Sequence, residues 1–271
     1  MTRTTRRYGR ILRVTGVGVA ALLALSACAS SGPDSGGESD ASARAGVSGT
    51  VNVFAAASLT ESFTELGRQF EKEHPGTEVV FNFGGSDSLA AGITSGAPAD
   101  VFASASPRTM KIVTDAGATE GTPATFVRNG LEIATLPGNP DRIASLKDLT
   151  GDGLKVVLCD RTVPCGAAAE KALTAAGLEL TPVSYEEDVK SALNKVVLKE
   201  ADAAVVYRTD VRAAGDKVEG VEFPEAAEAV NDYPITLLKD APNAGAGKAF
   251  IELVRSAEGR KALTGAGFTA P

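Results

Sequence analysis

The sequence predicts an α/β fold built from mostly parallel sheets flanked by helices. From residue 50 onward, short apolar runs of strand character alternate with segments whose apolar residues recur at helical spacing. This alternation is typical of βα units. No repeat of fixed period is visible, so a solenoid is not expected. The roughly 220 residues from position 50 onward could form one doubly wound domain or two lobes. The periodicity of the sequence alone does not decide between these two arrangements.

Seven runs of β-branched and apolar residues are expected to form the strands. They are Thr50–Ala55, Glu78–Phe83, Asp100–Ala103, Leu131–Leu136, Lys155–Leu158, Ala203–Tyr207 and Pro234–Leu238.

The clearest expected helix carries Leu59, Phe63, Leu66 and Phe70 on one face, at i, i+4, i+7 and i+11. It should end at the sequence Glu-His-Pro-Gly at 73–76, because proline and glycine break helices. The other expected helices are Leu89–Ser95, Arg108–Ala116, Ala167–Ala176, Val189–Lys199 and Lys248–Ser256.

The first 27 residues are typical of a secretory signal peptide. Five arginines and no acidic residue precede an uncharged run, Val14–Leu25. The run leads into Leu-Ser-Ala-Cys at 25–28, which resembles a bacterial lipobox, where the chain is cut before the cysteine and its thiol is lipidated. The alternative is a short membrane anchor, but about 12 apolar residues fall short of the roughly 20 that span a bilayer. We therefore expect removal of 1–27 and lipidation of Cys28.

Residues 28–48 would then form a flexible tether, because they are rich in Ser, Gly and Ala and have no apolar periodicity. The whole chain has 27 Lys and Arg against 34 Asp and Glu, a formal net charge of −7. Removing five arginines leaves 22 against 34, or −12. So acidic a chain is not expected to bind nucleic acid, which is held largely by Lys and Arg.

Metal and catalytic motifs are scarce. The single histidine, His74, and three cysteines without C-x-x-C spacing give too few ligands for a zinc site. No G-x-S-x-G or Walker loop is present. A secreted serine hydrolase using Ser58 or Ser86 is an alternative, but it would have to rely on His74. A cell-surface adhesion or scaffold protein is a third. We expect no enzyme activity, no cofactor and no metal.

Cys159 and Cys165 lie six residues apart, and export would place them in a compartment that permits disulfides. A bridge between them is the expectation, and two reduced cysteines are the alternative, because spacing alone does not establish the geometry.

Four segments place small or polar residues where a strand or loop opens a helix. They are 55–59, 84–88, 164–167 and 186–189. Helix amino termini carry unpaired N–H groups and partial positive charge, so several that converge can bind an anion. Each one alone could be an ordinary helix cap.

Taken in order, the motifs resemble a known family. They are VFAAASL at 53–59, GAPADVFASA at 96–105, VPCGAAAEKAL at 163–173, EEDVKSAL at 186–193, AAVVYRTDV at 203–211, Tyr-Pro at 233–234 and Gly-Phe at 267–268. Together they resemble the substrate-binding proteins of bacterial molybdate ABC transporters, over residues 50–269. The resemblance implies a two-lobed type II periplasmic-binding-protein fold with a ligand cleft between lobes. Lobe one would comprise 49–128 and 230–271, and lobe two 129–229.

In that family uncharged donors hold the oxyanion. Carried onto this chain, the resemblance implies three hydroxyl groups and two backbone N–H groups. They are the hydroxyls of Ser58, Ser86 and Tyr207 and the N–H groups of Cys165 and Val189. Ser86 lies in Gly-Gly-Ser-Asp, which is only loosely similar to the serine-rich segment of the family, and Cys165 stands where alanine is common.

The resemblance also implies a function. We expect a monomer, lipid-anchored on the extracytoplasmic face of the cell membrane, that captures molybdate and tungstate for an ABC transporter permease. The alternative within the same scaffold is another small oxyanion, such as sulfate or phosphate.

Overall fold

The computed structural model describes residues 47–271. The expected signal peptide, Cys28 and nearly all of the expected tether lie outside the described residues.

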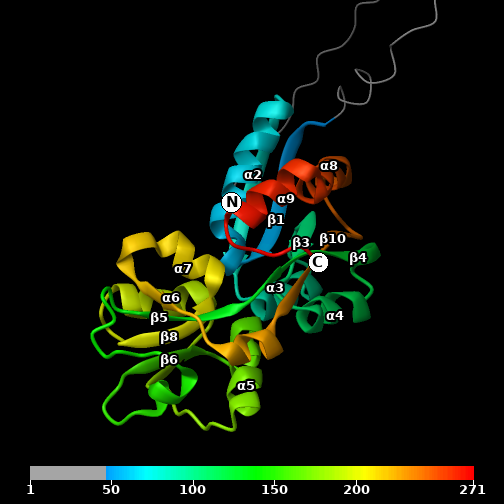
Figure 1. Ribbon diagram of the computed structural model, residues 1–271. Helices are drawn as coiled ribbons and strands as arrows, with labels where there is room; N and C mark the ends of the chain where they lie inside the picture. Colours follow the sequence, from blue (N-terminus) through cyan, green and yellow to red (C-terminus); the bar gives the residue numbers. More distant parts are fainter. Residues whose placement is uncertain (1–46) are drawn as a thin grey trace, which may run out of the picture. The chain divides into compact units, whose positions relative to one another are not determined.

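Two five-stranded sheets organise the described chain (Figure 1). The first has the order β2-β1-β3-β10-β4 and the second β7-β6-β8-β5-β9. The strands of the first sheet are β1 (Gly49–Ala56), β2 (Thr77–Gly84), β3 (Val101–Ala103), β4 (Thr119–Asn129) and β10 (Asn231–Leu238). Those of the second are β5 (Leu131–Thr135), β6 (Val156–Cys159), β7 (Ser184–Glu186), β8 (Ala203–Tyr207) and β9 (Glu219–Val221).

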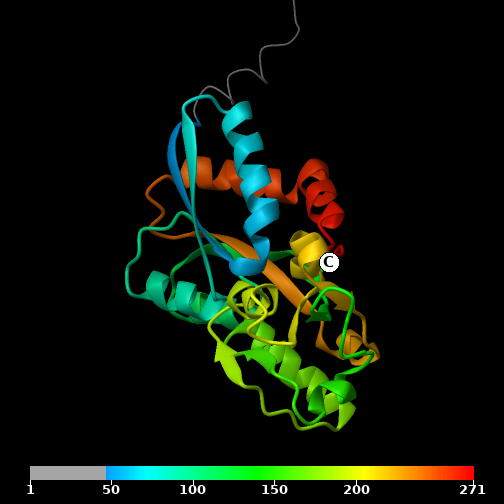
Figure 2. The same ribbon diagram turned by 90° about the vertical axis from the view of Figure 1, so that its left-hand side faces the viewer.

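Helices cover both faces of the first sheet. On one face lie α2 (Thr60–Glu73), α8 (Ala244–Arg255) and α9 (Ala257–Gly265), and on the other lie α3 (Ser86–Thr94) and α4 (Pro107–Asp115) (Figures 1 and 2). The predicted stripe of α2 is confirmed, because Leu59, Phe63, Leu66 and Phe70 are all fully buried. Phe63 packs edge-on against Phe250 of α8, with ring centroids 5.8 Å apart. This aromatic packing anchors the start of α2, next to Ser58.

The second sheet is covered by α5 (Pro164–Ala176), α6 (Val189–Val197) and α7 (Arg208–Ala214). All five residues of β8 are buried, as expected for an apolar run in the middle of a sheet. The described chain also has four short 3₁₀ helices: η1 (Ala57–Leu59), η2 (Leu146–Thr150), η3 (Gly215–Lys217) and η4 (Pro224–Ala229).

The chain passes between the sheets at two places. Only Gly130 separates β4 of the first sheet from β5 of the second, and the chain returns after η4, where β10 begins at Asn231. The carboxyl end of the described chain is tied to this region, because the backbones of Arg128 and Thr269 exchange two hydrogen bonds.

The two-lobed α/β class is confirmed, but the expectation of mostly parallel sheets is wrong. Of the eight strand pairs formed within 47–271, four are parallel and four antiparallel. Each antiparallel pair contains β5 or β10, the strands that follow the passages between sheets. No helix within 47–271 is both long and apolar enough to span a bilayer.

Candidate functional site

A small cavity of about 10 Å³ lies between the two sheets. Its walls come from the ends of strands and the beginnings of helices on both sides. All five residues expected to bind an anion line it: Ser58, Ser86, Cys165, Val189 and Tyr207. The structure therefore brings together residues that are up to 149 positions apart in the sequence.

Three α-helices begin at this cavity: α3 at Ser86, α5 at Pro164 and α6 at Val189. The α5 helix begins at Pro164, whose ring removes one N–H, and no side chain caps it. The next residue, Cys165, lines the cavity. Asp188 caps α6 by accepting hydrogen bonds from the N–H groups of Lys190 and Ser191, at 2.7 and 2.9 Å. The N–H of Val189, at the first helical position, is thereby left to donate elsewhere.

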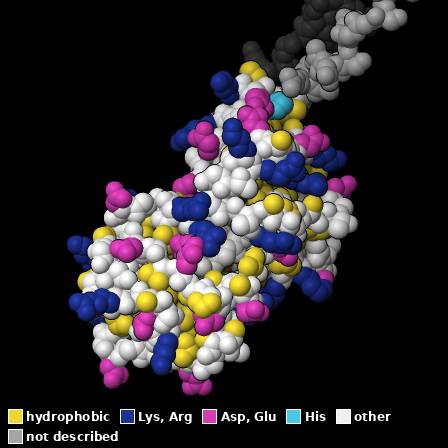
Figure 3. Space-filling model, in the orientation of Figure 1, with side chains coloured by type: hydrophobic (Ala, Val, Ile, Leu, Met, Phe, Trp, Pro, Cys, Tyr) yellow, Lys and Arg dark blue, Asp and Glu magenta, His cyan; other side chains and the backbone are white. Residues whose placement is uncertain are grey.

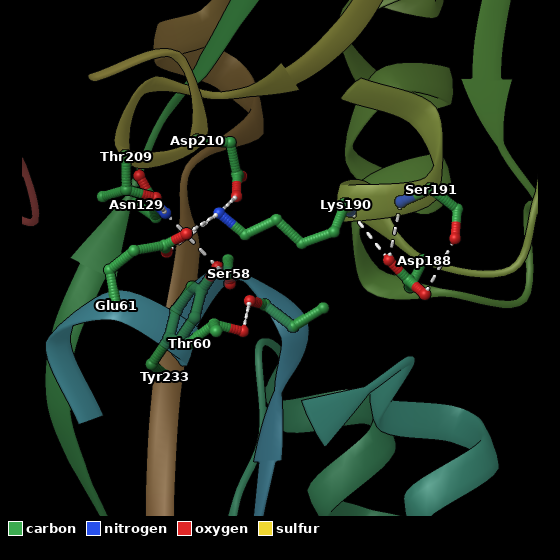
Figure 4. Close-up of polar contacts among 11 residues, drawn as sticks. Ser58, Thr60, Glu61, Asn129, Asp188, Lys190, Ser191, Thr209, Asp210 and Tyr233 are labelled. Atoms are coloured by element: carbon green, nitrogen blue, oxygen red, sulfur yellow. Dashed lines mark hydrogen bonds and ion pairs between the residues drawn. The ribbon is translucent and has the colours of Figure 1, made fainter. Parts of the chain in front are cut away.

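Asp188 is the one acidic residue in the cavity lining. Its second carboxylate oxygen accepts from the Ser191 hydroxyl at 3.1 Å, so both oxygens are occupied by α6 (Figure 4). A carboxylate held in this way strengthens the helix start, and its three hydrogen bonds to α6 leave little acceptor capacity for a ligand.

The Tyr207 hydroxyl is oriented by Asn231. The side-chain nitrogen of Asn231 donates to this hydroxyl at 2.7 Å and to the Pro164 carbonyl at 3.3 Å. A carbonyl can only accept, so the Asn231 amide must present its nitrogen on this side. The Tyr207 oxygen is therefore an acceptor towards Asn231, and its own proton can donate into the cavity.

Ser86 is oriented in the same way. Its buried hydroxyl accepts a hydrogen bond of 3.0 Å from the backbone N–H of Ala105, which can only donate. The hydroxyl proton of Ser86 is not used in this bond. Because Ser86 lines the cavity, this proton can be donated to a ligand there.

Ser58 belongs to a longer chain of hydrogen bonds (Figure 4). Its hydroxyl lies 2.8 Å from that of Tyr233, whose oxygen also receives the Asn129 amide at 3.4 Å. Asn129 is held by a 2.8 Å bond to the Thr209 hydroxyl. A buried hydroxyl proton without an acceptor is costly, so the favoured arrangement has Tyr233 donate to Ser58. Ser58 can then donate into the cavity.

Both tyrosines remain protonated donors at physiological pH. Burial raises the pKa of Tyr207 well above its usual value, and burial likewise raises the pKa of Tyr233, against the opposing effect of its bond with Ser58. The rings meet edge-on with centroids 6.0 Å apart. This pair links the end of β8 in the second sheet to β10 in the first.

Cys159 and Cys165 form a disulfide in the structure, with Cα atoms 5.8 Å apart. The bridge ties the end of β6 to the first turn of α5. Gly166 follows the bridge, and a Cβ there would collide with the carbonyl of Asp160. The backbone that carries the Cys165 N–H is thus packed closely against the loop that precedes it.

The two lobes touch around the cavity. A Cβ on Gly85 would come within 2.6 Å of the Glu187 carbonyl oxygen, so glycine permits this close approach. On the same rim, the guanidinium of Arg108 donates to the Thr162 carbonyl across the lobes. The arrangement is that of a closed cleft.

Among the described residues, no Lys or Arg lines the cavity. On the face drawn in Figure 3, basic and acidic side chains are interspersed over both lobes. The attraction for an anion therefore has to come from oriented hydroxyl and amide dipoles and from the starts of α5 and α6.

Nucleophilic catalysis has no support at this site. His74 follows the last residue of the 14-residue helix α2, about 20 Å along the axis from the end near Ser58. Both serines lack an imidazole to take their proton. Within residues 47–271, no group of three or more His, Cys, Asp or Glu side chains is placed to hold a metal ion.

Residue-by-residue reading of the sequence missed the residues behind the donors. Tyr233 was noted only within a motif, and Asn129 and Asn231 were not singled out. The available signal is that polar residues stand at the ends of β4 and β10, where the chain passes between sheets.

Two α/β lobes around a donor-lined cavity define a solute-binding protein. The comparisons with known proteins agree: the model of the family "Bacterial extracellular solute-binding protein" matches residues 51–269. The chain belongs to this family.

Several relatives carry names that state their ligand. The "Molybdate-binding protein ModA" of Mycobacterium tuberculosis (strain ATCC 25618 / H37Rv) is 44% identical over 95% of this chain and 97% of its own length. The protein of the same name from Escherichia coli (strain K12) is 33% identical over 82% of this chain and 89% of its own. Among solved structures, the periplasmic molybdate-binding protein of Azotobacter vinelandii covers 82% of this chain and 99% of its own, with a TM-score of 0.71 at 22% identity. At this low sequence identity, the similarity to the Azotobacter vinelandii protein supports the fold alone.

Proposed function

We propose that this protein captures molybdate, and also tungstate, in the cavity between its lobes and delivers it to the permease of an ABC importer. The observation that carries the proposal is the orientation of the donors. The hydroxyls of Ser86 and Tyr207 each accept from a protein donor, and Ser58 does so in the favoured arrangement with Tyr233, so each can present a proton to a ligand. The names of the relatives supply the identity of the anion.

A site made only of donors suits an anion that carries no proton. Molybdate at neutral pH is a doubly charged tetrahedral anion, and all four oxygens accept hydrogen bonds. Monohydrogen phosphate carries a proton that needs an acceptor, and the carboxylate of Asp188 already accepts three hydrogen bonds from α6. A buried donor left without a partner is costly, so phosphate is expected to bind poorly.

The number of donors permits tight binding if their orientation is fixed in advance. A hydrogen bond to a charged partner contributes roughly 1.5–3 kcal/mol, so five give about 8–15 kcal/mol. Association and ordering cost about 4–15 kcal/mol. The balance is favourable only if the donors are oriented before the ligand arrives, and the bonds from Asn231 and Ala105 provide that orientation.

Anion size should separate the remaining candidates. Sulfate has shorter bonds than molybdate and cannot reach all five donors together, whereas tungstate has nearly the same dimensions as molybdate. We therefore expect sulfate to bind more weakly and tungstate to bind comparably.

Binding would close the cleft. We assign lobe one to 49–128 with 230–271 and lobe two to 129–229, which places two serine donors on lobe one and the other three donors on lobe two. Only the closed form completes the set, so the anion shifts the protein towards that form.

Calorimetry with molybdate, tungstate, sulfate and phosphate tests the proposal. Tight binding of molybdate and tungstate, with sulfate and phosphate much weaker, is expected. Tight binding of sulfate or phosphate with no signal from molybdate would overturn it. A fluorophosphonate probe should not label the protein, whereas labelling of Ser58 or Ser86 would support a hydrolase.

Anchoring at the membrane is part of the same proposal. We expect the full-length protein to be a monomer held on the extracytoplasmic face through lipidated Cys28. Cys28→Ala should release the protein from the membrane fraction of expressing cells, and unchanged membrane association would contradict the anchor.

A further inference from the structure

A cluster of three charged side chains joins the lobes beside the cavity. Lys190 extends from α6 between Glu61 of α2 and Asp210 of α7 (Figure 4). Its amine lies 2.8 and 2.9 Å from the two Glu61 oxygens and 3.0 Å from an Asp210 oxygen. Asp210 is fully buried, and the Lys190 side chain is only 22% exposed.

Each member of this cluster is close in sequence to a donor of the cavity. Glu61 follows Ser58 by three residues, Lys190 directly follows Val189, and Asp210 follows Tyr207 by three residues. Lys190 and Asp210 belong to lobe two, and Glu61 belongs to lobe one. The bond from Lys190 to Glu61 is therefore the member of the cluster that crosses the cleft.

The cluster has two arms, the ion pair Lys190–Glu61 and the ion pair Lys190–Asp210, and they differ in their surroundings. Burial disfavours the charged Lys190 amine, but the carboxylates of Asp210 and Glu61 outweigh this effect and raise the pKa of Lys190. The Lys190–Asp210 arm is internal to lobe two and remains paired when the cleft opens. Glu61 is 53% exposed and can return to water, so the crossing arm can form and break with closure.

We propose that Glu61 and Lys190 form an electrostatic latch that holds the closed cleft and slows escape of the bound anion. The inference rests on the proposed function, which it deepens. The latch places the first turn of α6, with the Val189 N–H, against the start of α2 near Ser58. Glu61 and Lys190 act as positioning residues, because neither one lines the cavity.

Glu61→Gln is the sharpest test. It removes the charge of the crossing arm and leaves the buried Lys190–Asp210 pair intact, so the variant should fold normally. A matched control is Glu65→Gln, one turn along α2, where Glu65 is 70% exposed and pairs only with Arg68 of the same helix. Replacing Lys190 itself would leave Asp210 buried without a counter-ion and would confuse folding with binding.

Molybdate affinity and its dissociation rate are to be measured by calorimetry and stopped-flow competition at low and high salt. We expect Glu61→Gln to weaken binding about three- to tenfold, mainly through faster dissociation. The difference from the wild type should shrink at high salt, because the pair is partly exposed. Glu61→Lys, which places two amines together, should have the larger effect.

The outcomes separate the latch from the proposed function. If the wild type binds molybdate and Glu61→Gln dissociates no faster than Glu65→Gln, the latch is wrong and the binding function stands. If the wild type binds none of the four oxyanions, the proposed function is wrong, and the latch fails with it because it is defined by its effect on binding. A lower unfolding midpoint of ligand-free Glu61→Gln, with an unchanged dissociation rate, would assign the pair to stability alone and also overturn the latch.

Discussion

The side-chain amide of Asn231 donates a 2.7 Å hydrogen bond to the Tyr207 hydroxyl. Asn231 begins β10 in the first sheet, and Tyr207 ends β8 in the second. A residue at the return between the lobes therefore determines the direction of a hydroxyl proton in the cavity. The fixed direction of this proton restricts the site to ligands that accept.

Asn231→Asp should reverse the direction of this hydrogen bond. A carboxylate can only accept, so it would take the Tyr207 proton away from the cavity. We expect molybdate affinity to fall about ten- to a hundredfold, corresponding to one hydrogen bond to a charged ligand. Calorimetry measures the change, and circular dichroism checks that the fold is retained.

A double-mutant cycle separates this effect from that of the added charge. Asn194→Asp introduces the same charge at an exposed position of α6 and should have little effect. In a Tyr207→Phe background, the loss caused by Asn231→Asp should shrink towards that of Asn194→Asp, because no proton remains to be redirected. If Asn231→Asp lowers molybdate affinity as much in the Tyr207→Phe background as in the wild type, Asn231 does not act by orienting the Tyr207 proton.

Ser58→Ala and Tyr207→Phe should each weaken molybdate binding by about 1–3 kcal/mol while preserving the fold. Each one removes a donor and little buried volume. Ser86→Ala should act similarly, with Ser88→Ala on the exposed side of α3 as its control. Wild-type affinity in Ser58→Ala and Tyr207→Phe would refute the assignment of the site.

The central strands were predictable because their apolar runs are long. The strands that were missed, β4, β7 and β9, all lie at sheet edges. Edge strands are exposed on one side and carry fewer apolar residues, as the polar and proline-containing start of β4 illustrates. The helices α7 and α9 were not predicted. The helix α7 begins at Arg208, directly after β8, without a turn signal, and only Ser256 separates α9 from α8.

The proposed donors could be selected from the sequence because they follow strands in motifs with a family resemblance, and the structure brings them to one cavity. The groups that orient them were not, because hydrogen-bond direction depends on neighbours far away in the sequence. Ser86 and Ala105 are 19 positions apart, and Ser58 and Tyr233 are 175 apart. The pairing of Lys190 with Glu61 spans 129 positions and leaves no periodic signal in the chain.

Cys159→Ser should lower both stability and anion affinity. Opening a ring of this size removes a constraint on the unfolded chain worth about 2 kcal/mol. It also frees the backbone at Cys165, whose N–H is a proposed donor. Denaturant unfolding and calorimetry measure the two effects under non-reducing conditions. Thiol labelling and mass measurement, with and without reductant, check that the wild type is bridged, and labelling without reductant would contradict the bridge.

Asp210 should make stability depend on pH in a particular direction. Burial raises its pKa from 3.8 to about 6, although the Lys190 amine at 3.0 Å acts in the opposite direction. The folded protein therefore holds this proton more tightly than the unfolded chain does. The resulting stabilisation is fully present below pH 3.8 and is lost as the pH rises through about 6, a change of about 3 kcal/mol.

Asp210→Asn removes this titration, because an amide stays neutral. The unfolding free energy of the variant, relative to the wild type, should therefore rise by about 2 kcal/mol between pH 4 and pH 7. Denaturant unfolding across this range measures the difference, and the exposed Asp216→Asn is the control for an Asp to Asn change elsewhere. A difference that stays constant over the range would show that the pKa of Asp210 is not raised in the folded protein. In that case Lys190, rather than burial, would dominate the charge of this cluster.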